Sequence, residues 1–222
     1  MDLTIFNTID DLMLCFGFKE FGIVYGDDGI YIQENDTDKN GRKIKDAEVL
    51  ATIAKNIGGD LLEIGTSTGH GTYRLAVNTN GKVYTLNALP EQIGGNNITH
   101  ILKKEEIGSF LREKKISNYE QIYENSLRWI PDAKLLNSVG LAFIDGCHDT
   151  EYVLKDSLKA WSCLKEGGFL IWHDFNPELR GRFQWIDAAM RGVEIFLKTR
   201  KPETKVYHLR NSFIGMMRKM LP

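Results

Sequence analysis

The chain has 222 residues, of which 42% are hydrophobic and 26% charged, and this composition excludes an intrinsically disordered protein. The 28 basic and 30 acidic residues give a net charge of −2, which argues against nucleic acid as the main partner. The cysteines are widely spaced and form no C-x-x-C pair, which favours a reducing compartment. No apolar run approaches the roughly 18 residues that cross a bilayer, and the N-terminus lacks the basic start of a signal peptide. We therefore expect a cytoplasmic protein that does not enter the membrane.

The first 45 residues differ in pattern from the rest of the chain. Residues 21–35 contain two short β-like runs around Asp28 and Gly29, which predicts a hairpin. We therefore divide the chain into an N-terminal extension, residues 1–45, and a main domain, residues 46–222. The extension is either a lid or a dimer arm, and the sequence does not choose between them. A homo-oligomer is accordingly one option for the assembly.

From residue 46 onward, helix-like and strand-like segments alternate. Helical spacing of apolar residues predicts helices at 46–57, 70–78, 105–114, 149–164 and 183–198, with a broken helical segment at 126–136. Strands are predicted at 60–64, 82–86, 119–123, 139–145 and 169–173, followed by an antiparallel pair at 205–209 and 212–219. This alternation predicts an α/β fold with a mostly parallel, seven-stranded sheet, an antiparallel C-terminal strand and helices on both faces.

The segment LLEIGTSTGHGT, residues 61–72, joins the first strand of the alternating region to a helix. Ligands bind at such turns, because the carboxyl ends of parallel strands face a crevice. A P-loop is excluded, since no Gly-Lys-Ser/Thr follows, and the dinucleotide pattern fails because Ser67 and His70 replace its glycines. The helix N-terminus favours a carboxylate, and Glu63 adds a negative charge beside it. Such a pocket suits the zwitterion of an amino acid, although a glycine turn also occurs as a plain connection.

The spacing of Glu63, Gly65 and Gly69 resembles the first motif, E-x-G-x-x-x-G, of the class I S-adenosylmethionine (SAM)-dependent methyltransferases. The resemblance covers most of residues 46–218 and implies a Rossmann-like fold with SAM as the cofactor. It also implies cofactor contacts by the residues of the turn, which are Glu63, Gly65, Thr66, Ser67 and Gly69.

Further segments extend the resemblance. Residues 83–90, VYTLNALP, are similar to the strand and loop that meet the ribose, with Asn87 and Ala88 at the contact; the family usually has an acid where Asn87 stands. An amide still hydrogen-bonds a ribose hydroxyl, but without charge. Residues 123–131 resemble the segment that touches the adenine, where the family usually has Gly-Asp-Ser and this chain has Asn125 and Ser126.

The most specific match is FIDGCHDTEYVLKD followed by LKEGGFLIWHDF. It resembles a subgroup of small-molecule O-methyltransferases that includes the macrocin-type enzymes. In metal-dependent members of that group, the acidic residues after the fourth and fifth strands bind magnesium. The resemblance therefore implies Mg²⁺ at Asp145 and Asp174, and it also places Asp145 among the cofactor contacts.

The same two strand ends carry two acid–histidine pairs, formed by Asp145, His148, His173 and Asp174. One interpretation is structural, with the aspartates capping helices and His173 packing under a loop. The functional interpretation is favoured because both pairs converge at one edge of the sheet. Methyl transfer to oxygen requires removal of a proton, which calls for a general base or a metal. His148 or His173 is the expected base, and Asp145 and Asp174 are hard oxygen ligands.

The sequence thus predicts a SAM-dependent methyltransferase acting on a small-molecule acceptor, with a hydroxyl oxygen as the expected target. Two alternatives remain open at this point. A protein with the SAM fold can bind or regulate without turnover, and a non-haem iron oxygenase would use His148, His173 and Asp174 as its facial triad. The alternating β and α segments argue against the oxygenase, since those enzymes are usually built on jelly-roll folds.

Overall fold

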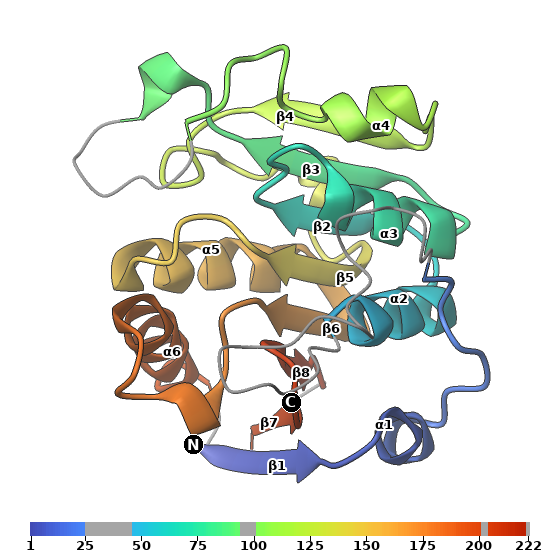
Figure 1. The fold of residues 1–222 in the computed structure, drawn as a ribbon, viewed down its shortest axis with the longest axis vertical. Helices are drawn as coiled ribbons and strands as arrows, with labels where there is room; N and C mark the ends of the chain where they lie inside the picture. Colours follow the sequence, from blue (N-terminus) through green and yellow to red (C-terminus); the bar gives the residue numbers. More distant parts are fainter. Residues whose placement is uncertain (25–45, 94–100, 201–203, 221–222) are drawn as a thin grey trace.

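The strands of the protein form one mostly parallel sheet. In the computed structural model, which describes residues 1–24, 46–93, 101–200 and 204–220, the strand order is β1-β7-β8-β6-β5-β2-β3-β4 (Figure 1). The strands are β1 Asp2–Phe6, β2 Leu61–Ile64, β3 Val83–Asn87, β4 Tyr119–Tyr123, β5 Val139–Ile144, β6 Leu164–Trp172, β7 Lys205–Leu209 and β8 Gly215–Arg218. Only β8 runs antiparallel to its described neighbours, β6 and β7. The predicted α/β sheet with an antiparallel C-terminal strand is confirmed.

The prediction of seven strands was wrong, because the described part of the sheet has eight. The additional strand is β1, which pairs in parallel with β7 so that Asp2 lies opposite Lys205. Its partner lies near the other end of the chain, and a local hydrophobic pattern does not reveal such a pairing. The helix α1, Ile9–Phe16, follows and begins with a capping box between Thr8 and Asp11.

Part of the N-terminal extension therefore belongs to the sheet. The predicted hairpin around Asp28 and Gly29 lies outside the described residues. The division into residues 1–45 and 46–222 stays a prediction, as does the role of the extension as a lid or a dimer arm.

The predicted helices are present with small changes at their ends. They are α2 Asp46–Ile57, α3 His70–Asn78, α4 Ser109–Glu113, α5 Thr150–Cys163 and α6 Gln184–Leu197. The helix α4 is shorter than the predicted segment 105–114. It begins only after Gly108, whose φ of 67° lies in the left-handed region and interrupts a right-handed helix. In the broken segment 126–136, the structure contains the short 3-10 helix η3, Ala133–Leu135.

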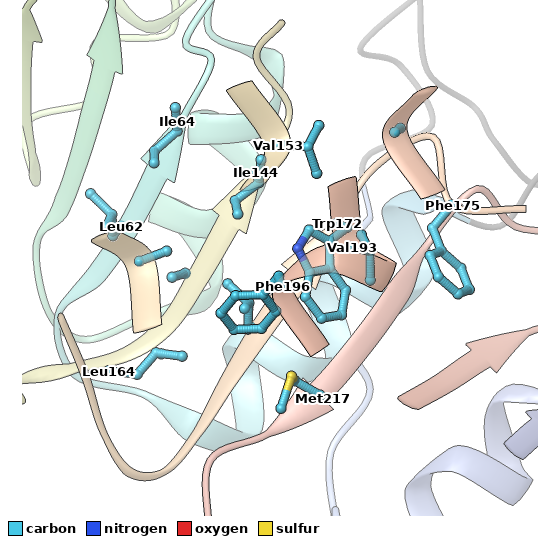
Figure 2. Close-up of a cluster of buried hydrophobic side chains, with 14 of the residues drawn as sticks. Leu62, Ile64, Ile144, Val153, Leu164, Trp172, Phe175, Val193, Phe196 and Met217 are labelled. Carbon is cyan, nitrogen blue, oxygen red and sulfur yellow. The ribbon is translucent and has the colours of Figure 1, made fainter. Parts of the chain in front are cut away.

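The helices cover both faces of the sheet (Figure 1). Leu62 and Ile64 of β2 join a core cluster with residues of α5 and α6, whereas Leu61 joins a second cluster with residues of α1 and α2. Alternate residues of a strand point to opposite faces, so a strand buried on both sides is apolar throughout. Figure 2 shows part of the first cluster, with the rings of Trp172 and Phe196 close together. Burial of each such side chain contributes about 1.5–3 kcal/mol relative to leaving it exposed.

This topology gathers the site at one edge of the sheet. The strands β4, β3, β2, β5 and β6 are consecutive neighbours and all run in the same direction. Their carboxyl ends therefore meet at one edge. The segments that follow these ends are those in which the sequence predicted functional residues.

Candidate functional site

The glycine turn between β2 and α3 is held tightly against the rest of the fold. Gly65 and Gly69 have φ values of 115° and 104°, a region that side-chain-bearing residues rarely adopt. A Cβ on Gly65 would overlap the carbonyl group of Asp145, and a Cβ on Gly69 would lie 2.7 Å from Cγ of Leu111. Both positions therefore require glycine, for conformation and for space.

Glu63 lies beneath this turn and is fully buried. The hydroxyl groups of Thr72 and Thr85 donate hydrogen bonds to its Oε2, the latter at 2.6 Å. Burial nevertheless outweighs these hydrogen bonds and raises the pKa of Glu63 to about 8. The carboxyl group is therefore protonated at neutral pH, and the negative charge that we expected here is absent because the side chain is shielded from water. Its assignment to cofactor binding stays a prediction.

Asn87 ends β3 and connects it to the glycine turn. Its Oδ1 accepts a hydrogen bond from the backbone N–H of Ser67 at 2.9 Å, and its Nδ2 donates to the carbonyl oxygen of Ala88 at 2.9 Å. Ser67 has a φ of 50°, so the turn is in the left-handed region there too. The amide of Asn87 thus fixes the shape of the turn and still lines the cavity described below.

The segment after β4 is fixed by α5. Oδ1 of Asn125 accepts a hydrogen bond from the backbone N–H of Leu127 at 2.9 Å. Nζ of Lys159 donates to the carbonyl oxygens of Ser126 and Leu127, at 2.5 and 2.9 Å. These hydrogen bonds satisfy backbone carbonyl groups of the loop and hold it in one conformation.

A buried acid on α5 supports the same segment. Asp156 is inaccessible to solvent, and its pKa is raised to about 7 because burial outweighs a hydrogen bond from Ser126 and the charge of Lys159. The side chain touches the loop and does not line the cavity. We interpret it as a structural support of the loop.

The acid–histidine pairs form one cluster after β5 and β6. Nε2 of His148 lies 2.6 Å from Oδ2 of Asp174, and Nδ1 of His173 lies 3.1 Å from Oδ1 of Asp145 and 3.3 Å from Oδ2 of Asp174. One potential ligand atom from each of these four residues lies within 4.8 Å of the others. The prediction that these four side chains lie close together is therefore confirmed.

Opposite charges dominate the ionisation of this cluster. Burial alone would lower the pKa of His173, but the carboxylates of Asp145 and Asp174 raise it well above its ordinary value. The pKa of His148 is raised in the same way, against burial, by Asp174. Burial would raise the pKa of Asp174, yet the two histidines lower it below its ordinary value. The carboxylates thus favour the protonated form of both histidines, most strongly in His173.

Asp46 is part of the cluster and was missed by the sequence analysis. It is the first residue of α2 and is buried. Its Oδ2 lies 3.2 Å from Nε2 of His173, and its Oδ1 accepts a hydrogen bond of 2.5 Å from the backbone N–H of Phe213. Both ring nitrogens of His173 therefore face carboxylates. An aspartate at a helix start looks like an ordinary N-terminal residue, so no sequence signal marked this contact.

One cavity of about 610 Å³ is lined by both the glycine turn and the charged cluster. This volume is within the range of about 300–1,000 Å³ that is usual for small-molecule sites. The predicted site residues that line it are Gly65, Thr66, Ser67, Asn87, Ala88, Asn125, Ser126, Asp145, His148, His173 and Asp174. Glu63 and Gly69 are not among the lining residues. Asn176, which follows the cluster in sequence, caps the short helix η4, Pro177–Leu179.

Several lining residues carried no usable signal in the sequence. They include Asp46, Arg74, Glu124 and Tyr152. Arg74 lies four residues after His70 on α3, and its position there is typical of a surface residue in a helix. Only the packing of α3 against the sheet makes it a buried wall of the cavity.

Residues 62–175 match a family of proteins described as "Methyltransferase domain". The match spans more than half of the chain and contains β2 apart from Leu61, the glycine turn and the two acid–histidine pairs. The chain belongs to this family. Its fold is the Rossmann-like fold of the class I SAM-dependent methyltransferases, as the resemblance implied. Among curated proteins, no sequence matches the chain.

Solved structures agree on the fold. The O-methyltransferase NovP has a TM-score of 0.62 and 12% identity over 79% of each chain. The O-methyltransferase TomG from Streptomyces achromogenes, in complex with SAM, has a TM-score of 0.56 and 16% identity, also over 79% of each chain. The N-methyltransferase NodS from Bradyrhizobium japonicum WM9 has a TM-score of 0.53 and 15% identity, over 79% of this chain and 94% of its own. At these identities the likeness shows the fold alone.

These comparisons distinguish some of the alternative functions that the sequence left open. Membership of a methyltransferase family and the α/β architecture leave the iron oxygenase without support. Methyltransferases that act on oxygen and on nitrogen share the fold, so the fold does not choose the acceptor atom. In the described ranges, no helix combines the length and the apolar character needed to span a membrane.

Proposed function

We propose that this methyltransferase transfers the methyl group of SAM to a hydroxyl oxygen of a small-molecule acceptor. The observation that carries the proposal is the single cavity lined by the glycine turn at one side and by Asp145, His148 and Asp174 at another. A methyl donor bound at the turn would lie beside groups that bind and deprotonate an oxygen acceptor. Alignment of the two reactants supplies much of the rate enhancement in such a displacement.

Different residues of the cavity suit different parts of the SAM molecule. The N-terminus of α3 offers backbone N–H groups to the carboxylate of the methionine portion. The turn from Gly65 to Ser67 lines the cavity and gives it its shape, since its own N–H groups already bond to Leu86 and Asn87. Asn87, Asn125 and Ser126 line the part of the cavity at the ends of β3 and β4, where we place the nucleoside. This arrangement puts the sulfur of SAM between the turn and the charged cluster.

The cluster also fits a magnesium ion. Asp145 and Asp174 offer the hard carboxylate oxygens that Mg²⁺ prefers, and their ligand atoms are close enough to share one ion. When bound there, Mg²⁺ would lower the pKa of an acceptor hydroxyl. Asp145 and Asp174 would hold the ion, and the histidines would balance the charge of the remaining carboxylate oxygens.

Of the two histidines, His148 is the better candidate for the general base. Both ring nitrogens of His173 face carboxylates, Asp46 on one side and Asp145 with Asp174 on the other. A ring held in this way donates both of its protons and has no lone pair for the acceptor. His148 contacts Asp174 through Nε2 only, so in its neutral form Nε2–H donates to Asp174 and Nδ1 keeps the lone pair that receives the proton of the hydroxyl group.

Our proposal that the acceptor atom is oxygen depends on this cluster. An amine acceptor attacks through its lone pair once it is neutral, whereas an alcohol needs its proton removed as the new bond forms. A histidine supported by a buried carboxylate beside the cavity serves the alcohol. This is why we propose oxygen although the fold occurs in both kinds of enzyme.

The test uses SAM labelled in its methyl group and pairs of acceptors that differ only in a hydroxyl or an amino group. We expect label on the hydroxyl compounds, with a lower rate after chelation of divalent metal and in Asp174→Asn. The matched control is Asp10→Asn, which neutralises an exposed aspartate on α1. Label on the amines alone, at a rate that does not depend on Asp174, would contradict the proposal. Tight cofactor binding with no label on any acceptor would favour the binding protein without turnover.

A further inference from the structure

The ends of β3 and β4 carry a carboxylate that the sequence analysis did not single out. Glu124 directly follows β4, and its backbone N–H donates a hydrogen bond of 3.2 Å to the carbonyl oxygen of Asn87. The two residues are therefore neighbours at adjacent strand ends. Both line the cavity. Glu124 thus lies in the part of the cavity that receives the nucleoside in our proposal.

Glu124 is distinct among the acids of this cavity. The other acids lining it are Asp46 of α2, Asp145 and Asp149 between β5 and α5, and Asp174 after β6. None of these follows β3 or β4. Asn87, which ends β3, is neutral, and its amide already bonds to the glycine turn. Among the described residues, a negative charge at this end of the cavity comes from Glu124.

The contacts of Glu124 anchor one carboxylate oxygen and leave the other to a ligand. Oε1 accepts a hydrogen bond from the backbone N–H of Asn125 at 2.8 Å and lies 3.6 Å from Nε of Arg128. Within the described part of the chain both contacts are made by Oε1, and the side chain is 36% exposed. Oε2 therefore keeps its capacity to accept hydrogen bonds. The anchor reduces the entropy that a flexible glutamate would lose on binding a ligand.

We propose that the carboxylate of Glu124 binds the ribose hydroxyl groups of SAM. The inference rests on the proposed function, because it assumes that the nucleoside of SAM occupies this cavity. A vicinal diol presents two O–H donors, and a carboxylate presents acceptors only. Hydrogen bonds to a charged acceptor are roughly twice as strong as neutral ones. Glu124 on β4 thereby supplies the charge that Asn87 on β3 lacks.

Isothermal titration calorimetry of three ligands tests this role. The ligands are S-adenosylhomocysteine, its 2′-deoxy analogue, and S-inosylhomocysteine, which lacks the exocyclic amine of adenine. They are titrated into the wild type and Glu124→Gln. Glutamine keeps an acceptor for the N–H of Asn125, removes the charge and replaces the second carboxylate oxygen with an NH₂ group, which donates. The matched control is Glu91→Gln, since Glu91 is exposed, lies near the same strand ends and does not line the cavity.

We expect Glu124→Gln to bind S-adenosylhomocysteine roughly 10- to 100-fold more weakly, in line with loss of a charge-assisted hydrogen bond. The wild type should prefer the parent ligand over the 2′-deoxy analogue, and Glu124→Gln should lose most of that preference. The penalty for the inosine analogue should be equal in both proteins. Glu91→Gln should match the wild type with every ligand.

Two results would overturn the inference. In one, Glu124→Gln keeps the full preference for the 2′-hydroxyl. In the other, the variant loses its preference for the adenine amine, which would assign Glu124 to the base. Failure of the wild type to bind S-adenosylhomocysteine at high micromolar concentration would instead overturn the proposed function itself. Thermal unfolding of each variant, together with Glu124→Asp, distinguishes a local effect from misfolding.

Discussion

The glycine turn after β2 and the charged cluster after β5 and β6 line one cavity, yet they are built in opposite ways. The turn consists of close backbone contacts and neutral groups: Gly65 lies against the carbonyl of Asp145, and Glu63 is protonated at neutral pH. The cluster consists of carboxylates and imidazoles within ion-pair distance.

The difference predicts how each region responds to mutation. Added volume should damage the turn, because its backbone has no room, whereas loss of charge should damage the cluster. Isosteric neutralisation of the cluster should leave the fold and cofactor binding largely intact. Addition of a methyl group to the turn should affect both folding and binding.

The largest effect is expected for Asp174→Asn. Asparagine fits the left-handed backbone of Asp174, whose φ is 54°, so the fold should be retained. Loss of the carboxylate removes the charged partner of both histidines and, in our proposal, a charged ligand of Mg²⁺. We expect kcat for methyl transfer to fall about 10²- to 10⁴-fold, with affinity for S-adenosylhomocysteine within about threefold of the wild type. A fall in affinity as large as the fall in kcat would show that the two regions are not separable.

Gly65→Ala should show the reverse pattern. The new Cβ would overlap the carbonyl of Asp145 in a backbone conformation that alanine rarely adopts. We expect a loss of about 2–5 kcal/mol in the free energy of unfolding, measured with urea, and loss of cofactor binding. Gly146→Ala is the control in the same cavity, because its Cβ would meet Ile64 at ordinary contact distances of 3.5 Å and beyond. Equal destabilisation by both substitutions would contradict the steric account.

Glu63→Gln tests the neutral character of the turn through the pH dependence of stability. The pKa of Glu63 in the folded protein, about 8, exceeds its ordinary value of 4.5. The native state therefore holds a proton that the unfolded chain has released, and stability falls as the pH rises from about 4.5 towards 8. Glu63→Gln should remove this component, roughly 3 kcal/mol between pH 5 and pH 8. An unchanged slope would mean that Glu63 is ionised in the folded protein; the exposed control Glu105→Gln should leave the slope unchanged.

A smaller effect is expected for Asp46→Asn. The amide can still accept the hydrogen bond from Phe213, but its NH₂ group would face the N–H of His173. We expect kcat to fall about 10- to 100-fold, since supporting partners of a site usually contribute this much. KM for SAM should change little, because Asp46 contacts the cluster and not the turn. A change in KM without a change in kcat would place Asp46 in cofactor binding.

The glycine turn and the charged cluster also differ in how much of each could be predicted from the sequence. The strand–turn–helix from β2 to α3 was predicted closely because glycine positions and apolar runs are local patterns. The meeting of Asp145 with Asp174 followed from the rule that parallel strands end at one edge. The pairing of β1 with β7 and the contact of Asp46 with His173 depend on residues far apart in the chain. The protonation of Glu63 depends on burial, which a motif does not report.

The most direct test of the account is a structure of the protein with bound S-adenosylhomocysteine. We expect the ligand in the cavity that the turn and the cluster line, with its methionine portion at Gly65 to Ser67, its sulfur facing Asp145 and His148, and its ribose at Glu124. Binding elsewhere, or with the sulfur turned away from the charged cluster, would contradict the claim that the two regions form one site for methyl transfer.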